Sequence, residues 1–314
     1  MDFSIKFDTL PSGRPELVIG FGVFDGVHPG HRLIMTNVVE IAAGRSAIPA
    51  AITFSPHPRA VIPGMQAPAA IISLEKRIAR LRQCGAAVTG IIDFTPEFGA
   101  MEPEEFLDSL LRRQDFRIGG ICVGEDWRFG RGGKGDAAML KLFADANGLG
   151  FRAVKRLEYK NINISSSIIR ELIAAGKLEE AEEISGSTPE LCGIVRRGFR
   201  IAGRELNAPT ANLELTAGVM VPDGVYAGKC ELENRVYAAV LNIGLSPTYG
   251  GNERRIEVHL LDFNGDLYGR ELTVQLLKFL RPERKFNDPS ELKEQITRDI
   301  AEATVIFNDK TRSN

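Results

Sequence analysis

The chain has 314 residues, 44% of them hydrophobic, and its 39 Lys and Arg nearly balance its 41 Asp and Glu, so that the formal net charge is -2. This length predicts about two domains, with ample apolar material for two cores. The balanced charge gives no electrostatic reason to expect binding to nucleic acid or to an anionic membrane surface, and no stretch approaches the roughly 20 apolar residues of a membrane span.

The N-terminus and the cysteines both favour a cytoplasmic protein. Asp2, Lys6 and Asp8 interrupt the region where a secretory signal peptide needs an apolar core. The cysteines lie far apart without a CxxC pair, which predicts neither a zinc site nor a disulfide framework. We expect them to be small core residues. They are Cys84, Cys122, Cys192 and Cys230.

The first clear unit is a strand, a glycine-rich turn and a helix. An apolar run at 17–21 precedes the segment GVFDGVHPGH at 22–31, and an amphipathic pattern follows from Leu33. Glycines at 22, 26 and 30 permit positive φ and close approach of backbone N–H groups, and the start of a helix attracts anions. The turn therefore predicts a phosphate site.

Two histidines strengthen this prediction. His28 and His31, three residues apart, lie on one side of the turn, and both imidazoles can donate to phosphate oxygens without a metal. The alternative is an ordinary helix start in which backbone carbonyls satisfy both rings. Two histidines beside three glycines favour the phosphate site.

Strand-like and helix-like segments then alternate as far as residue 154. Apolar runs predict strands at 50–54, 88–94, 120–123 and 151–154, and periodic segments predict helices at 74–81, 103–111 and 137–146. This alternation predicts a parallel sheet with helices on both faces. Ligands bind such sheets beyond the carboxyl ends of the strands. We therefore expect the turns at 22–31, 55–58 (SPHP) and 123–136 to converge on one crevice.

A serine run opens the next helix, in the segment INISSSIIRELIAAG at 162–176. Ser165, Ser166 and Ser167 supply hydroxyl and N–H groups at the positive end of the helix, and Arg170 follows with a guanidinium suited to phosphate. Taken alone, the segment fits an ordinary N-cap with a solvated arginine. Together with the histidines it predicts a second contact with phosphate.

The pattern changes at SGSTPEL, 185–191, where turn-forming residues end the helical signal, and we place domains at 1–186 and 187–314. Short strand-like runs follow at 193–195, 212–215, 225–232, 236–243, 256–261 and 272–277. Their spacing predicts a small antiparallel barrel or sandwich. A helix begins at Pro289 and is expected to cover one side of it.

This second domain contains its own candidate site. Thr210 and Asn212, at the end of the basic segment 196–215, carry oxygens that suit Mg²⁺ and phosphate. Arg255, Glu257 and His259 alternate along one strand and share a face, where a carboxylate can be a general base. From spacing alone, a surface salt-bridge ladder is the better explanation of this alternation.

A resemblance to a known family connects these segments. The chain resembles, nearly end to end, the bacterial bifunctional riboflavin kinase and FMN adenylyltransferase, also called FAD synthetase. The matching segments, in the family's order, are GVFDGVHPGH, TFSPHPRAV, VGEDWRFG, ISSSIIR, APTANL, PDGVYA, LNIGLSPTYG, IEVHLLDF, DLYG and LRPERKF. The resemblance implies an α/β protein in which a Rossmann-like parallel-sheet nucleotidylyltransferase domain precedes a small antiparallel β-barrel with a C-terminal helix.

For the first domain, the resemblance implies attack of FMN on the α-phosphate of ATP, giving FAD and pyrophosphate. His28 and His31 would hold the phosphates and stabilise the transition state. The serines and Arg170 would hold the triphosphate or the departing pyrophosphate. Cofactor-binding residues across both domains would be Gly22, Phe24, Asp25, Gly26, His57, Asp126, Ser165, Ser166, Ser167, Gly198, Arg204, Thr210 and Asn212.

For the second domain, the resemblance implies phosphorylation of riboflavin to FMN by a second ATP. Thr210 and Asn212 would position Mg²⁺ and phosphate, and Glu257 would accept the proton of the attacking hydroxyl. The partners are then small molecules, namely riboflavin, FMN and ATP, with no nucleic acid and no membrane. The sequence leaves the oligomeric state open, a homo-oligomer included.

One departure from the family pattern keeps an alternative open. Asn207 and Ala208 stand before PTAN where the family usually has glycine and an aromatic residue. The alternative is an FMN adenylyltransferase whose barrel binds flavin but is impaired as a kinase. Two others are a non-catalytic flavin- or nucleotide-binding regulator, which leaves the histidines, serines and Glu257 without a role, and a cytidylyltransferase acting on a small phosphorylated alcohol, which leaves the barrel unexplained.

Overall fold

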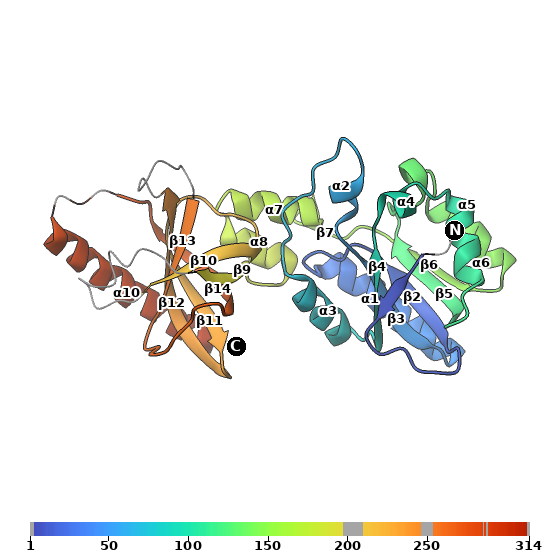
Figure 1. Ribbon diagram of the computed structural model, residues 1–314, viewed down its shortest axis with the longest axis horizontal. Coiled ribbons are helices and arrows are strands. Elements are labelled where there is room, and N and C mark those ends of the chain that lie inside the picture. Colours follow the sequence, from blue (N-terminus) through green and yellow to red (C-terminus); the bar gives the residue numbers. More distant parts are fainter. Residues whose placement is uncertain (1–2, 197–209, 246–253, 285, 287, 313–314) are drawn as a thin grey trace. The chain divides into compact units, whose positions relative to one another are not determined.

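The computed structural model describes residues 3–196, 210–245, 254–284, 286 and 288–312. Contacts divide it into two compact units, one of Met1–Pro68 with Leu74–Ser166 and the other of Ala69–Ser73 with Ser167–Asn314 (Figure 1). The second unit thus takes in the chain from Ser167 onward, including residues before the boundary expected at 186/187.

The first unit is built on a mostly parallel sheet, as the alternating pattern predicts. Within the described residues its strands lie in the order β1 (Ile5–Phe7), β4 (Val88–Asp93), β3 (Ile48–Ser55), β2 (Glu16–Phe21), β5 (Arg117–Gly124) and β6 (Gly150–Val154). All neighbours are parallel except β1, which pairs antiparallel with β4. The short edge strand β1 was not predicted.

The helices of this unit follow the predicted segments closely. They are α1 (Pro29–Arg45), α2 (Pro58–Val61), α3 (Leu74–Gln83), α4 (Pro96–Gly99), α5 (Pro103–Leu111) and α6 (Ala137–Ala146), with a 3₁₀ turn at Arg131–Gly133 and a hairpin of β7 (Glu158–Tyr159) and β8 (Ile162–Asn163). The predicted helices at 103–111 and 137–146 coincide with α5 and α6.

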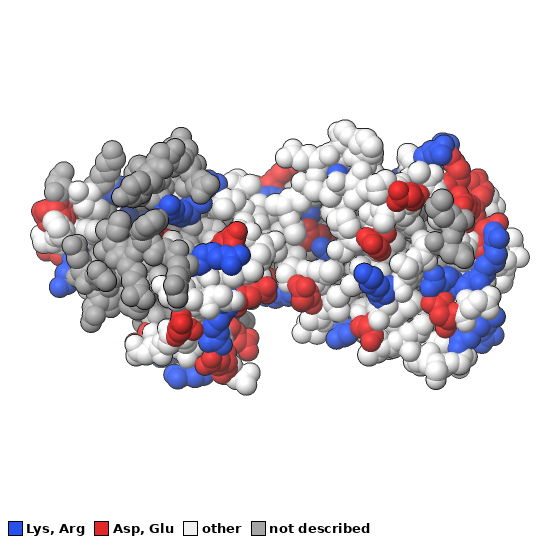
Figure 2. Space-filling view, in the orientation of Figure 1, with Lys and Arg blue, Asp and Glu red and all other residues white. Residues whose placement is uncertain are grey.

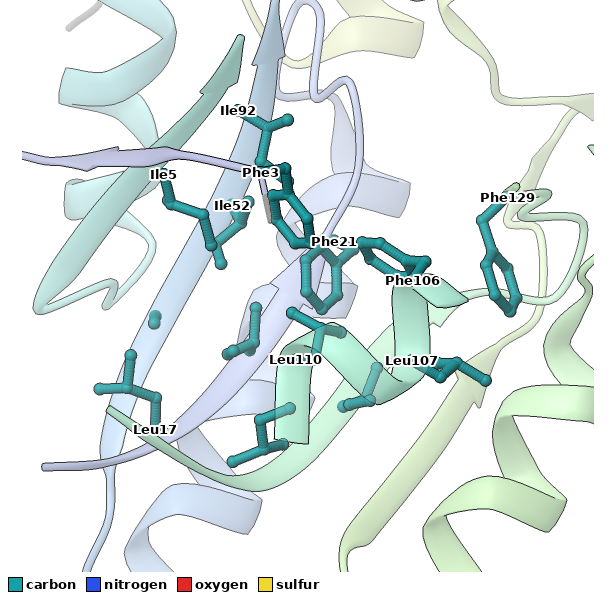
Figure 3. Close-up of a cluster of buried hydrophobic side chains, with 14 of the residues drawn as sticks. Phe3, Ile5, Leu17, Phe21, Ile52, Ile92, Phe106, Leu107, Leu110 and Phe129 are labelled. Carbon is teal, nitrogen blue, oxygen red and sulfur yellow. The ribbon is translucent and has the colours of Figure 1, made fainter. Parts of the chain in front are cut away.

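Helices cover both faces of the sheet, which explains the uninterrupted apolar run of β2. Leu17, Ile19 and Phe21 belong to a buried cluster with residues of α5 (Figure 3). On the opposite face, a Cβ at Gly20 would lie 3.1 to 3.4 Å from side chains of α1. A strand buried on both faces needs apolar residues at every position, whereas a half-exposed strand alternates.

The second unit contains a closed antiparallel barrel. Of the two folds that the strand spacing predicts, the barrel is therefore correct and the sandwich is not. Its strands run in the order β10 (Ala211–Ala217), β13 (Arg254–Leu260), β12 (Arg235–Leu245), β11 (Gly224–Leu232), β14 (Glu271–Arg281) and β9 (Glu190–Arg196). β9 pairs again with β10 and closes the ring. α7 (Ser166–Ala174) and α8 (Leu178–Ser185) precede the barrel.

The C-terminal helix α10 (Pro289–Arg312) packs against β11, β12 and β14, as expected. A buried ion pair fixes it, because the carboxylate of Asp299 accepts hydrogen bonds from Arg281 Nε at 3.0 Å and Nη2 at 2.8 Å. Asp299 is 4% exposed. The helix is thus tied to the end of β14 by charge as well as by apolar packing.

The cysteines occupy the packing positions expected of them. Cys122, Cys192 and Cys230 are buried and Cys84 is half-buried. Burial raises the pKa of the Cys122 thiol to about 12 and that of Cys230 to about 11. Thiols with such values stay protonated near neutral pH and are poor nucleophiles.

The surface carries mixed charge, in keeping with the net charge of the chain. Figure 2 shows Lys and Arg interspersed with Asp and Glu on the face in view. Several charged side chains of the chain are paired, such as Lys134 with Glu102 at 3.1 Å. In the residues that the structure describes, no helix has both the length and the apolar content to cross a membrane.

Candidate functional site

Three of the predicted turns lie at the same edge of the sheet. β3, β2 and β5 are adjacent and parallel, so their carboxyl ends carry the turns after Ser55, Phe21 and Gly124 side by side. The chain passes from β2 to β3 on one side and later to β5 on the other. β2 therefore lies at the switch point, where open parallel sheets bind their ligands.

The segment Gly22–His31, here called the histidine turn, joins β2 to α1. His28 is the N-cap residue of α1 and is 6% exposed, and Pro29 occupies the first turn of the helix. The rings of His28 and His31 stack with centroids 3.7 Å apart and an interplanar angle of 22°. Two imidazoles thus lie together where the positive end of a helix dipole attracts an anion.

The glycines of the turn have a different role from the one predicted. Among them only Gly26 has a positive φ, of 84°, whereas Phe24 and Val27 adopt positive φ values of 53° and 46°. At Gly22 a Cβ would lie 3.0 Å from the Phe24 ring, and at Gly30 it would lie 3.2 Å from the His28 ring. Of the three glycines that permit positive φ, Gly26 alone adopts it, and Gly22 and Gly30 make room for rings.

Hydrogen bonds hold five consecutive carbonyl groups of the histidine turn. The acceptors and donors are Val23 O with Thr53 Oγ1 (2.9 Å), Phe24 O with Val27 N (3.1 Å), Asp25 O with Ser166 Oγ (2.9 Å), Gly26 O with Arg80 Nη1 (3.2 Å) and Val27 O with Arg32 Nε (3.1 Å). Fixing each carbonyl fixes its peptide plane, and hence the direction of the following N–H group.

The predicted serine run reaches the histidine turn through Ser166, the first residue of α7. Its hydroxyl donates to the Asp25 carbonyl at 2.9 Å, although the two residues are 141 positions apart. A hydroxyl has a single proton, so while this bond lasts Ser166 Oγ cannot also donate to a phosphate. Ser165 is half-buried and Ser167 exposed. Ser167 and Arg170 belong to the second unit.

Arg170 and two other predicted residues have partners of their own. Arg170 Nε donates to the Ala69 carbonyl at 2.7 Å. His57 caps α2, and its Nδ1 accepts from the Arg59 N–H at 3.1 Å, so in the neutral ring the proton is on Nε2. Asp126 is exposed and pairs with Arg156 at 2.5 Å. His57 and Asp126 follow β3 and β5, beside the histidine turn.

In the barrel, the register of three strands aligns polar residues. Asn212 of β10 and Asn242 of β12 both pair with Glu257 of β13. Each lies between buried apolar neighbours, so the three side chains share the outer face of the barrel and form what we call the polar ladder. Thr210 is half-buried and directly precedes β10. Gly198, Arg204, Asn207 and Ala208 lie outside the described residues.

Glu257 has the environment of a base. Burial raises the pKa of its carboxyl, and the charge of Glu283 acts in the same direction, while Arg255 opposes both. Arg255 and Glu257 alternate with buried residues as predicted, but within the described part of the chain no ion pair involves Glu257. A half-buried carboxylate with a raised pKa can act as a general base near neutral pH.

Two groups of contributing residues were missed by the sequence analysis. Asn242 lies in a segment quoted for the resemblance, and its place between Leu241 and Ile243 marks it as the polar position of a strand, but only the register brings it to Glu257. Thr53 and Arg80 reach the histidine turn from β3 and α3. Thr53 begins the segment TFSPHPRAV quoted for the resemblance and Arg80 lies in the predicted helix at 74–81, but no local pattern gives either of them a role at the turn.

Comparisons with known proteins cover both units. A family model described as FAD synthetase matches residues 11–168, and one described as riboflavin kinase matches residues 185–307. The chain is 36% identical over 303 residues to the bifunctional riboflavin kinase/FMN adenylyltransferase of Bacillus subtilis (strain 168), covering 94% of both chains. It is 34% identical over 291 residues to that of Escherichia coli (strain K12), covering 92% of both.

A solved structure of similar extent shares the fold. The crystal structure of a macrolide-efflux protein from Streptococcus pneumoniae matches with a TM-score of 0.80 and 28% identity, covering 92% of this chain and 94% of that one. One solved chain thus contains counterparts of both the sheet and the barrel.

Proposed function

Because the chain belongs to the family of bifunctional riboflavin kinase/FMN adenylyltransferases, we propose that the histidine turn is its adenylyl-transfer site and the polar ladder its phosphoryl-transfer site. The protein is an enzyme with both activities: it phosphorylates riboflavin to FMN and adenylylates FMN to FAD. The match to both family models favours this over an adenylyltransferase with an impaired barrel.

At the histidine turn, a phosphate oxygen of FMN attacks the α-phosphorus of ATP. The bond from that phosphorus to the bridging oxygen of the β-phosphate breaks, and pyrophosphate leaves with the electron pair. His28 and His31 donate to the phosphate oxygens and stabilise the charge that develops there. The stacked imidazoles at the start of α1 are the observation that carries this proposal.

We assign further residues to the adenylyl-transfer reaction. Ser165, Ser167 and Arg170 hold the triphosphate or pyrophosphate, and Ser166 contributes its backbone N–H, since its hydroxyl donates to Asp25. Phe24 and Asp25 are 0% and 2% exposed, so their contribution comes through the backbone. The other residues assigned to ATP or FMN are Gly22, Gly26, His57 and Asp126.

At the polar ladder, the terminal hydroxyl of riboflavin attacks the γ-phosphorus of ATP. Glu257 accepts the hydroxyl proton, the bond to the β,γ-bridging oxygen breaks, and FMN and ADP result. Thr210 and Asn212 offer the oxygen donors that a hard cation prefers, and would hold Mg²⁺. When bound, Mg²⁺ neutralises phosphate charge. We assign nucleotide contacts to Gly198 and Arg204 as well.

We also propose sequence domains at 1–186 and 187–314. The barrel strands and α10 all lie in the second, and the parallel sheet lies in the first. Activity on three small metabolites supports a place in the cytoplasm. The proposed partners are small molecules, without nucleic acid or membrane, and a homo-oligomer stays an open alternative.

A time course with the whole protein tests the proposed function. Riboflavin and MgATP are incubated with it, and the flavins are separated by chromatography. We expect FMN to appear first and FAD later, and supplied FMN to give FAD without a lag. If riboflavin yields no FMN while supplied FMN yields FAD, the kinase assignment fails. If FMN accumulates and never becomes FAD, the adenylyltransferase assignment fails.

A further inference from the structure

The histidine turn keeps an unfavourable backbone. Phe24 and Val27 both have positive φ, and a left-handed conformation is unfavourable for a non-glycine residue because its Cβ approaches the backbone. For a β-branched residue such as Val27 the conformation is rarer still. Such residues keep this shape only where their surroundings impose it. The groups that bind the turn's carbonyls are therefore candidates for a role in catalysis.

Two of these groups belong to residues to which neither the sequence pattern nor the family resemblance gave a role. Thr53 of β3 is 1% exposed and donates to the Val23 carbonyl at 2.9 Å. Arg80 of α3 is half-buried and donates to the Gly26 carbonyl at 3.2 Å. They hold the turn at positions on either side of Phe24 and Asp25.

A third residue, Arg77, donates a hydrogen bond to the hydroxyl of Thr53 and so orients it. Arg77 is 7% exposed, and its Nη1 donates to Thr53 Oγ1 at 3.3 Å and to the Phe54 carbonyl at 3.4 Å. A threonine hydroxyl has one proton and two lone pairs. Because Arg77 occupies a lone pair, the proton of Thr53 is directed to Val23. Arg77 and Arg80 lie one turn apart in α3, so a single helix holds the turn at two points.

We propose that Thr53, oriented by Arg77, and Arg80 are positioning residues for adenylyl transfer. They hold peptide planes of the histidine turn in the orientation that aims its N–H groups and the ring of His28 at the phosphates. This inference rests on the proposed function of the turn. None of the three touches the reacting atoms in the proposed mechanism, so their effect on the reaction passes through the turn.

The test compares Thr53→Val with Thr53→Ser in the full chain. Valine removes the hydroxyl at nearly constant volume, and serine retains it. With FMN and MgATP we expect Thr53→Val to lower kcat at least tenfold with less than a threefold change in KM for FMN, and Thr53→Ser to stay within threefold of wild type. Phosphorylation of riboflavin by the same protein should stay within twofold in both variants.

Folding of the first unit has its own reporter. Trp127 is the single tryptophan of the chain, and its ring stacks on Phe21 and Phe129 in that unit. Unchanged tryptophan emission shows that a loss of FAD formation does not reflect unfolding. If Thr53→Val alters the emission, Arg80→Met replaces it, because methionine keeps an apolar stem without the guanidinium, and the same results are expected of it.

A double-mutant cycle separates positioning from general destabilisation. In a His28→Ala background the positioned ring is already absent, so we expect Thr53→Val to lower the residual rate less than twofold. Full adenylyltransferase activity of Thr53→Val, or effects of the two changes that simply multiply, would overturn the inference. Full activity of His28→Ala would instead overturn the proposed function of the turn, and the two failures are thus distinguishable.

Discussion

The histidine turn and the polar ladder both present groups suited to phosphate chemistry, but they are assembled in opposite ways. The turn is one continuous segment whose backbone is bent by bonds from β3, α1, α3 and α7. The ladder takes one side chain from each of β10, β13 and β12, and regular strand pairing brings them together. The turn needs its surroundings to keep its shape, whereas the ladder needs only the barrel register.

This difference predicts how each site responds to change. In the turn, residues that never meet the substrate should affect the reaction, because they hold its backbone. In the ladder, effects should concentrate on the side chains themselves, since a strand in a closed barrel has little freedom to shift. Variants of both sites in one chain can test this, because each activity serves as the reference for the other.

The largest expected effect is that of His28→Ala. We expect FAD formation from FMN to fall about 10³-fold, the loss typical of removing one donor to the transition-state charge. FMN formation from riboflavin should stay within twofold, because it takes place at the barrel. Rates are measured by chromatography of the flavins with each substrate supplied separately. An equal loss of both activities would contradict two separate sites.

Glu257→Gln should give the reverse pattern. Glutamine keeps the shape and cannot accept the proton, so we expect riboflavin phosphorylation to fall about 10²-fold, the lower end of what a general base contributes. FAD formation from supplied FMN should be unchanged. Glu231→Gln makes the same substitution at an exposed position of β11 and serves as the matched control. A fully active Glu257→Gln kinase would refute the general-base role.

A smaller effect should separate the stability of the two regions. Asp299→Asn weakens the buried pair with Arg281, and we expect the barrel to lose about 2–3 kcal/mol of unfolding free energy. In urea, kinase activity should be lost at a lower concentration, while the emission of Trp127 in the first unit keeps its midpoint.

The matched control for that experiment is Glu302→Gln, at an exposed position of α10. It should leave both urea midpoints in place. If Asp299→Asn lowers both urea midpoints together, the barrel and the first unit unfold as one. The two regions then do not differ in stability.

The sequence predicts the elements of the fold where the pattern is periodic and local. The helix at 103–111 coincides with α5, and the strand at 225–232 begins only one residue inside β11. Strand β1 was not predicted from the sequence, because it has three residues and depends on partners that are distant in the chain. The carboxylate of Asp8, next to it, accepts from Thr89 N at 3.0 Å and pairs with Arg82.

The same limit applies to the two sites. His28 and His31 are recognisable because their residue types and spacing are local signals, whereas the spacing around Glu257 favours a salt-bridge ladder and only the family resemblance gives this residue the role of a base. Asn242 and Arg80 are not recognisable, since one enters its site through strand register and the other through a side chain that crosses from α3. Glycine content predicts that a turn is tight, but it does not say which residues take the left-handed conformation or which make room for a ring.

The smallest expected effect concerns the pH dependence of the kinase. Burial raises the pKa of Glu257, and Glu283 raises it further. A Cβ at Gly244 would collide with the Glu283 carboxylate, which places that charge against the strand beside Glu257. Because the base must be deprotonated, kcat/KM for riboflavin should fall on acidification at a pH above the usual glutamate pKa of about 4.3.

Removing the charge of Glu283 should shift the acid limb of the pH profile for riboflavin phosphorylation in a definite direction. In Glu283→Gln one of the causes that raise the pKa of Glu257 is gone, so the acid limb of riboflavin phosphorylation should move to lower pH. The profile of FAD formation should stay in place, because the histidine turn does not depend on this carboxylate. Glu271→Gln, at the exposed start of β14, the strand that ends two residues before Glu283, controls for the loss of a charge. If the acid limb stays fixed in Glu283→Gln, the charge of Glu283 does not raise the pKa of Glu257. If the acid limb moves to higher pH, Glu283 acts on Glu257 by holding a cation rather than by repulsion.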